Sequence, residues 1–257
     1  MVIARTTRIE NIHITMTNGT GDLPKMSQTP DCLLPSTNSE GIADLMPSMQ
    51  GDFLDYPLAY GSVRRDGDYR GRTIHFYVDD SRFNALGNAV NYGDHFWKLW
   101  ERPDRVWKSG SPSFVECNFS TSNAQPRWRA LEQIGKKRHL SRYWQERGML
   151  CWVDLNVAPR WWEENLLGVP LGWKAYATRV HKNDSLQSIT DQAALAESHA
   201  GTDAIKFFVY GHRKEIEDLC MRQGWLYVSE QATIWQKRDD NKKALQSEKK
   251  MTLEAWI

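Results

Sequence analysis

The sequence predicts an α/β protein in which repeated β–α units form a mostly parallel sheet covered by helices. Six short apolar runs alternate with stretches of helical pattern over most of the chain. A strand, a crossover helix and a second parallel strand make the right-handed unit from which such sheets are built. Six strands suit either an open sheet or an incomplete barrel, and hydrophobic periodicity does not choose between the two.

The predicted strands are short runs rich in β-branched and aromatic residues. They cover 73–78, 113–115, 149–153, 173–178, 204–210 and 226–228. Helical patterns cover 126–147, 185–199 and 214–223. Gly148 and Gly224 follow two of these patterns, as is typical of helix C-termini. This regular alternation is the reason to expect parallel strands.

Composition divides the chain of 257 residues into three parts. We expect residues 1–52 to form a loosely ordered N-terminal arm, because Thr, Ser, Asn, Gly and Pro recur in it. Residues 53–235 are expected to form a single α/β domain, and residues 236–257 a charged tail that ends in a short apolar interaction motif. The net charge of +1 restricts any contact with nucleic acid to local clusters of basic residues.

Several classes of function are disfavoured by motifs that the sequence lacks. Four scattered cysteines without a CxxC pair fit neither a zinc knuckle nor a disulfide framework, and they suit a reducing cytoplasm. No apolar stretch approaches the ~18 residues that span a membrane, so we expect a cytoplasmic protein with no membrane partner. The sequence has no HxH, HExxH, GxSxG, GxxxxGK or GxGxxG pattern. This disfavours zinc, serine-hydrolase, P-loop and dinucleotide chemistry.

Polar side chains follow the predicted strands, at the edge of a parallel sheet where ligands bind. The candidate catalytic residues are Asp79, Asp80, Asp154, Asn156 and Arg179. In one interpretation Asp79, Asp154 and Glu230 are oxygen ligands of Mg²⁺ in phosphodiester chemistry. In another, Asp79 or Asp154 acts as nucleophile or general base while Arg179 holds a phosphate. Asp and Asn also cap helices at such positions, so capping is the competing interpretation.

A basic stretch within the predicted helix 126–147 is the best local signal for nucleic-acid binding. Its cations are Arg127, Arg129, Lys136, Lys137, Arg138 and Arg142, and Trp128, Tyr143 and Trp144 lie among them. Cations that face phosphates, together with rings that stack on bases, are typical of such contacts. The alternative is a helix that covers the sheet and turns a solvated basic face outward.

The last residues of the sequence, 250–257, form an apolar motif after a polar stretch. Leu253, Trp256 and Ile257 are spaced i, i+3, i+4, so one helical turn would place them on one face. The motif resembles the peptide with which many archaeal and eukaryotic replication and repair proteins bind the sliding clamp. Lys250 stands where that motif usually has Gln, and Ile257 where it has Phe or Leu. The resemblance implies a sliding-clamp partner; a helical turn that folds back is the alternative.

Further motifs in the body of the chain resemble the uncharacterised family DUF4417. They are Ile74–Phe83, Ser111–Phe114 with Phe119–Ser120, Arg142–Gln145 before Gly148, Gly168–Pro170 and Val209–Gly211. The resemblance spans about residues 53–230 and implies a protein of a mobile genetic element, such as a phage or plasmid. Members commonly have Ser-Pro-Asp-Phe where this chain has Ser-Pro-Ser-Phe, so no catalytic role is carried onto Ser113.

Three functional hypotheses follow from these patterns. The first is a DNA-acting protein of a mobile genetic element, a replication or DNA-processing accessory recruited to the host sliding clamp. The second is a small-molecule or nucleotide-processing α/β enzyme, which predicts a deep pocket around Asp79 and Asp154. The third is a non-catalytic adaptor. The tail and the basic helix favour the first.

Overall fold

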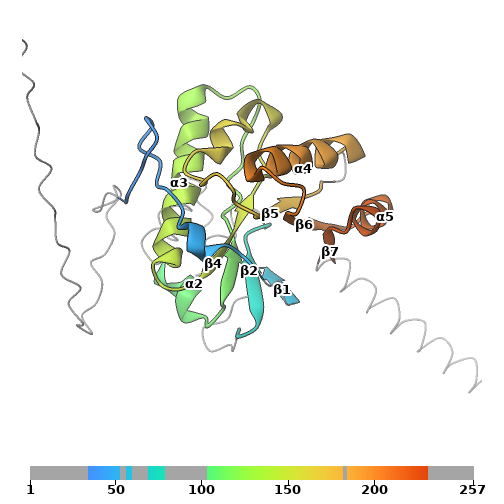
Figure 1. The fold of residues 1–257 in the computed structure, drawn as a ribbon, viewed down its shortest axis with the longest axis horizontal. Coiled ribbons are helices and arrows are strands. Elements are labelled where there is room, and N and C mark those ends of the chain that lie inside the picture. The colour runs from blue at the N-terminus through green and yellow to red at the C-terminus, as the bar shows by residue number, and fades with distance from the viewer. Residues whose placement is uncertain (1–33, 53–55, 60–68, 79–102, 182–183, 231–257) are drawn as a thin grey trace, which may run out of the picture.

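The computed structural model describes residues 34–52, 56–59, 69–78, 103–181 and 184–230 (Figure 1). Within them seven strands form one sheet in the order β1 to β7, and all six pairings are parallel. The strands are β1 (Tyr56–Ala59), β2 (Arg72–His75), β3 (Ser113–Val115), β4 (Leu150–Asp154), β5 (Ala175–Arg179), β6 (Lys206–Gly211) and β7 (Leu226–Ser229). The α/β prediction is confirmed. Because strand order follows chain order, the sheet winds in one direction as a half-barrel.

The helices connect successive strands and lie alongside the sheet (Figure 1). They are α2 (Asp104–Lys108), α3 (Arg127–Gln145), α4 (Leu186–Ala200) and α5 (Lys214–Gln223). Ser185 caps α4 by accepting a hydrogen bond from the Ser188 amide. Gly224 ends α5 with a φ of 70°, a left-handed conformation that glycine adopts without strain. No described helix has the length and apolar character needed to cross a bilayer.

Strand residues form a core in two layers, because successive side chains of a strand point to opposite faces. Phe114, Cys151, Val153, Tyr176 and Val209 belong to a cluster with the inward faces of α3, α4 and α5. Their neighbours Val115, Trp152, Ala177, Phe208 and Tyr210 form a second cluster on the other face of the sheet. Strands buried on both faces explain why the sequence shows continuous apolar runs rather than alternation.

Residues 34–52 differ from the expected loose arm, because they pack on α3 and the sheet. Leu45 is 1% exposed, and its amide donates to the Gly168 carbonyl at 2.7 Å. A Cβ at Gly168 would lie 2.2 Å from the Ala43 carbonyl oxygen, so the close approach requires glycine. The domain therefore includes this segment. Residues 1–33 and the predicted tail, 236–257, lie outside the described residues.

Candidate functional site at the carboxyl edge

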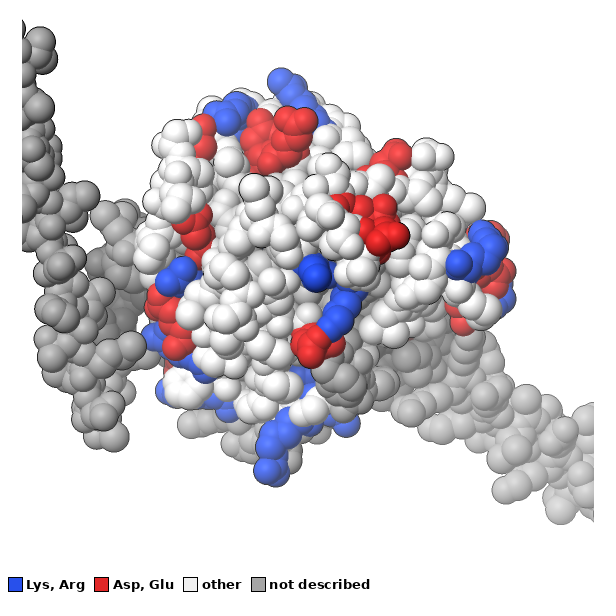
Figure 2. Space-filling model, in the orientation of Figure 1, with Lys and Arg blue, Asp and Glu red and all other residues white. Residues whose placement is uncertain are grey.

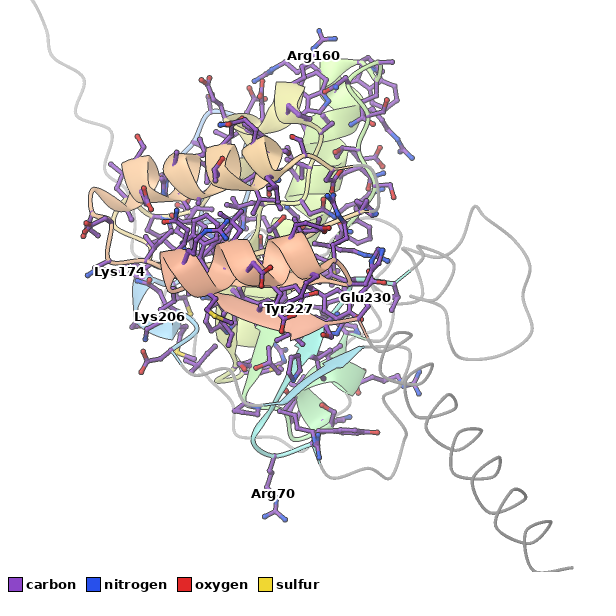
Figure 3. All side chains as sticks on the ribbon, turned by 90° about the vertical axis from the view of Figure 1, so that its right-hand side faces the viewer. Arg70, Arg160, Lys174, Lys206, Tyr227 and Glu230 are labelled. Carbon is purple, nitrogen blue, oxygen red and sulfur yellow. The ribbon has the colours of Figure 1, made fainter. Side chains whose placement is uncertain are left out.

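A cavity of about 710 Å³ opens at the carboxyl ends of β2, β3, β4 and β5. The described residues that line it are Val78, Asn118, Ser120, Thr121, Asn156, Val157, Ala158, Pro159, Arg179, His181, Asp184, Ser188 and Gln192. Figure 3 shows the direction of the sheet: Glu230, after β7, lies at this edge, and Lys174 and Lys206 lie at the opposite one. The cavity thus lies where parallel α/β folds bind ligands.

Two loops that line the cavity are hydrogen-bonded to each other. The β3–α3 loop supplies the Thr121 hydroxyl, which accepts from the Ala158 amide at 2.7 Å. The β4–β5 loop supplies Trp161, whose Nε1 donates to the Ser122 carbonyl at 2.8 Å. These bonds fix one wall of the cavity, and Asn118 is a buried member of its lining, with 9% of its surface exposed.

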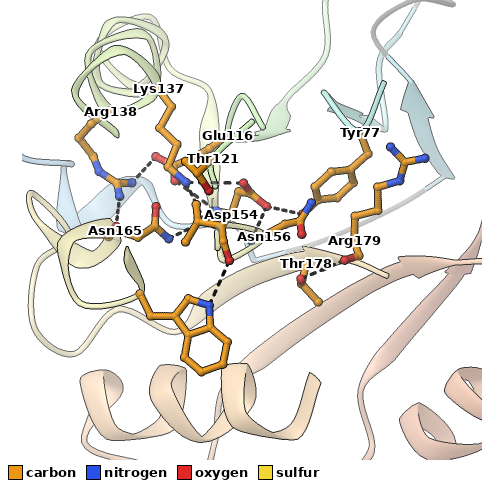
Figure 4. Close-up of polar contacts among 12 residues, drawn as sticks. Tyr77, Glu116, Thr121, Lys137, Arg138, Asp154, Asn156, Asn165, Thr178 and Arg179 are labelled. Atoms are coloured by element: carbon orange, nitrogen blue, oxygen red, sulfur yellow. Dashed lines mark hydrogen bonds and ion pairs between the residues drawn. The ribbon is translucent and has the colours of Figure 1, made fainter. Parts of the chain in front are cut away.

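Asp154 lies behind the cavity lining and supports it. Its side chain is wholly buried, and its Oδ1 accepts from the Tyr77 hydroxyl at 2.9 Å and from the Asn156 amide at 3.0 Å (Figure 4). Burial raises the pKa of Asp154, and burial followed by the nearby Asp154 carboxyl raises that of Tyr77. Asp154 therefore holds the turn that presents Asn156. It is not among the described residues that line the cavity, and its catalytic role stays a prediction.

Two buried ion pairs lie between α3 and the sheet. Arg138 contacts Glu116, and Lys137 lies 3.5 Å from Asp154 while its Nζ donates to the Asp154 carbonyl at 2.9 Å (Figure 4). Burial lowers the pKa of Lys137, and the neighbouring carboxylates oppose that shift. Arg138 also donates to the carbonyls of Leu167 and Asn165. These contacts fasten α3 to β3, β4 and the loop before β5.

Arg179 and His181 reach the cavity from the end of β5. The Arg179 Nε donates to Glu230 at 3.1 Å, so its charge is compensated from β7. The His181 amide donates to the Asp184 carboxylate at 2.7 Å, and its Nε2 lies 3.5 Å from the Asn156 Nδ2. The predicted residues Asn156 and Arg179 are thus both on the lining, and Asp79 and Asp80 lie outside the described residues.

The first two turns of α4 supply Ser188 and Gln192, which the strand-end pattern did not indicate. Four positions separate them, so they lie on one face of the helix. Gln192 is 7% exposed, and its Oε1 accepts from the Thr178 hydroxyl at 2.6 Å. The available signal in the sequence was two polar residues four positions apart, soon after the helix cap Ser185. The described residues contain no group of three His, Cys, Asp or Glu side chains arranged for a metal ion.

The six basic residues predicted to bind nucleic acid all have partners. Lys137 and Arg138 are interior residues, 2% and 0% exposed, so they are not available to a phosphate backbone. The other four contact carboxylates: Arg127 contacts Glu40 and Glu164, Arg129 and Lys136 contact Glu132, and Arg142 contacts Glu146. On the side where α3 lies, basic and acidic side chains alternate (Figure 2).

Of the aromatic residues predicted to accompany those cations, Trp144 lies inside the protein and Trp128 on its surface. Trp144 is buried, stacks on Phe76 and donates from Nε1 to the Pro103 carbonyl at 2.8 Å. Trp128 is 67% exposed. The sequence pattern therefore describes a helix that covers the sheet, with its cations held by acidic neighbours.

Comparisons with known proteins identify no relative of this chain. No family model matches the chain, and searches of curated proteins and of solved structures give no match. The resemblance to DUF4417 and the sliding-clamp motif stay predictions.

Proposed function

We propose that the protein binds a small polar molecule in the carboxyl-edge cavity, as expected of a small-molecule or nucleotide-processing α/β enzyme. The observation that supports this function is the cavity itself, formed by loops from four neighbouring strands and the start of α4. Its volume of about 710 Å³ falls within the ~300–1,000 Å³ typical of small-molecule sites. Asn156, Arg179 and His181 are the side chains at successive strand ends that would contact the ligand.

A cavity-filling substitution tests this function. The Ser188→Trp variant would place an indole in the cavity, and Ser198→Trp places the same ring at an exposed position of the same helix. The three proteins are heated with a panel of nucleosides, nucleotides, sugars and carboxylic acids. A ligand whose free concentration is 100 times its Kd stabilises the folded state by about 2.7 kcal/mol.

At least one compound should raise the melting temperature of the wild type and of Ser198→Trp, and leave that of Ser188→Trp unchanged. Both variants without ligand should melt near the wild type. A panel without any such compound, or one that stabilises all three proteins equally, would remove the support for a ligand site in the cavity.

A second proposal, recruitment to a sliding clamp during DNA processing, rests on the motif at 250–257. The basic helix adds little to it, because its cations are paired. The full chain and its Leu253→Ala, Trp256→Ala variant are titrated into an archaeal sliding clamp by calorimetry. Micromolar binding that the double substitution abolishes would support this role, and equal heats for both proteins would contradict it. A non-catalytic adaptor, the remaining hypothesis, predicts instead that Asp79→Asn and Asp154→Asn fold normally and leave function intact.

A further inference from the structure

Three carboxamide side chains from three elements meet at the cavity. Asn118 follows β3, Asn156 follows β4 and Gln192 lies on α4. A carboxamide offers a donor and an acceptor side by side. Three such groups around one space suit a ligand that itself presents donors and acceptors close together.

Gln192 is held in one orientation. The Thr178 hydroxyl donates to its Oε1 at 2.6 Å, which leaves the Nε2 amide as the group offered to the cavity. No hydrogen bond of Nε2 is found with the described residues, although the side chain is more than nine-tenths buried. Gln192 is therefore a fixed and available donor.

Asn156 offers the complementary group. Its Nδ2 faces the His181 Nε2 at 3.5 Å, and its backbone amide is used by Asp154. With Nδ2 turned to the imidazole, Oδ1 remains as an acceptor. Asn118 makes no hydrogen bond with the described residues through its side chain and is 9% exposed, so it supplies both a donor and an acceptor. Asn118 and Gln192 are not among the fully buried polar atoms that lack a partner, so their free groups are exposed to the cavity, where a ligand or water can pair with them.

The cation on the lining is paired, and the carboxylate on it already accepts a hydrogen bond. Arg179 is paired with Glu230, and the Asp184 carboxylate accepts from the His181 amide. Val78, Val157 and Pro159 add an apolar wall against which a flat ring can pack. Arg179 is thus partly engaged by Glu230, and the three carboxamides are the uncharged groups of the lining that can read a ligand.

We infer that the cavity recognises the uncharged base of a nucleoside, with its hydrogen-bonding edge read by Asn118, Asn156 and Gln192. This inference rests on the proposed function and names the ligand class for the same site. A carboxamide with both groups free can pair with a base edge through two adjacent hydrogen bonds, as Asn118 could. Gln192 would add one donor and Asn156 one acceptor. The ring faces would contact the apolar wall.

The test compares ligands by calorimetry with the full-length protein. The set contains the common nucleosides, their 5′-monophosphates, and ribose and glucose. One nucleoside should bind, and its monophosphate should bind no more than about threefold more tightly. A monophosphate that binds more than about tenfold more tightly would overturn the inference while the proposed cavity function stands. Binding of a sugar without any nucleoside would overturn it in the same way, and absence of all binding would overturn both.

Substitutions at Gln192 give the sharpest variant test. The Gln192→Glu variant keeps an oxygen to accept from Thr178 and loses the amide donor, so nucleoside affinity should fall about tenfold or more. Gln192→Met, which introduces no buried charge, should show a similar loss and serves if the glutamate variant does not fold. Gln187→Met is the matched control, since Gln187 is exposed on the same helix and contacts Asp191. Unchanged affinity in folded Gln192 variants would contradict the inference.

Discussion

Two regions of this protein bury polar side chains, and they use them in different ways. In the interface between α3 and the rest of the domain, Arg138 faces Glu116, Lys137 faces Asp154, and Gln145 has three hydrogen bonds to the segment 46–49. In the carboxyl-edge cavity, Asn118 and part of Gln192 have no partner among the described residues. Burial and unused hydrogen-bonding capacity do not by themselves distinguish a structural polar group from a binding group, because Asp154 Oδ2 and Asn165 Oδ1 in the interface also lack a hydrogen-bond partner among the described residues. Access to the cavity makes the distinction, since Asn118 and Gln192 line it.

The largest expected effect comes from breaking the interface at Arg138. The Arg138→Met substitution leaves the Glu116 carboxylate buried without its opposite charge, which costs about 3–5 kcal/mol. The free energy of unfolding in urea measures this loss. Arg129→Met removes a half-exposed pair with Glu132 from the same helix and should cost less than about 1 kcal/mol. Similar losses for the two variants would mean that the interface charges are not structural.

His75 sharpens the comparison, because it is a buried polar group that belongs to neither region. Its ring lies on the sheet beside Tyr210, with a centroid distance of 4.4 Å, and its Nε2 has no hydrogen-bond partner within the part of the chain that the structure describes. Burial, with the charge of Arg179 as a smaller cause, lowers the pKa of His75 from 6.5 to about 3. The neutral ring is thus favoured by folding.

This lowered pKa predicts acid destabilisation. His75 takes up a proton near pH 6.5 in the unfolded chain but only near pH 3 in the folded protein. Its contribution to the free energy of unfolding is therefore fully present above pH 6.5 and is lost as the pH falls below that value. At pH 5 the loss from this one group is about 2 kcal/mol. In His75→Phe the difference between unfolding free energies at pH 7 and pH 5 should shrink by that amount. An unchanged difference would exclude His75 as its source.

Gln145 gives an intermediate effect. Its Oε1 accepts from the Met46 amide at 2.8 Å, and its Nε2 donates to the carbonyls of Met46 and Met49. The Gln145→Met substitution removes these bonds at similar volume and should cost about 1–2 kcal/mol in urea unfolding. It should also make residues 42–49 easier to cleave with protease. A loss no larger than that of Gln192→Met would remove the distinction between the two regions.

Much of the fold was predictable, and less of the site was. Buried strands and glycine-terminated helices leave local patterns, so the parallel sheet was expected. Asn156 and Arg179 line the cavity because neighbouring parallel strands end at the same edge of the sheet. Arg138 was assigned to a nucleic-acid surface because a basic helix has the same sequence pattern whether its cations face solvent or buried carboxylates. Leu45 joins the core beside Gly168, 123 positions further along the chain, and Met46 bonds to Gln145, 99 positions further along. No local pattern reports such contacts.

The smallest expected effect on stability is at Asn118, and it is informative for that reason. An interface residue loses contacts when it is replaced, but Asn118 has no hydrogen bond within the described protein to lose. The Asn118→Leu substitution should therefore change the free energy of unfolding by no more than about 0.5 kcal/mol, because removing a partnerless polar group is close to neutral. The same variant should lose ligand-dependent stabilisation. A destabilisation as large as that of Gln145→Met would instead assign Asn118 to the structural group and leave the cavity without its clearest binding residue.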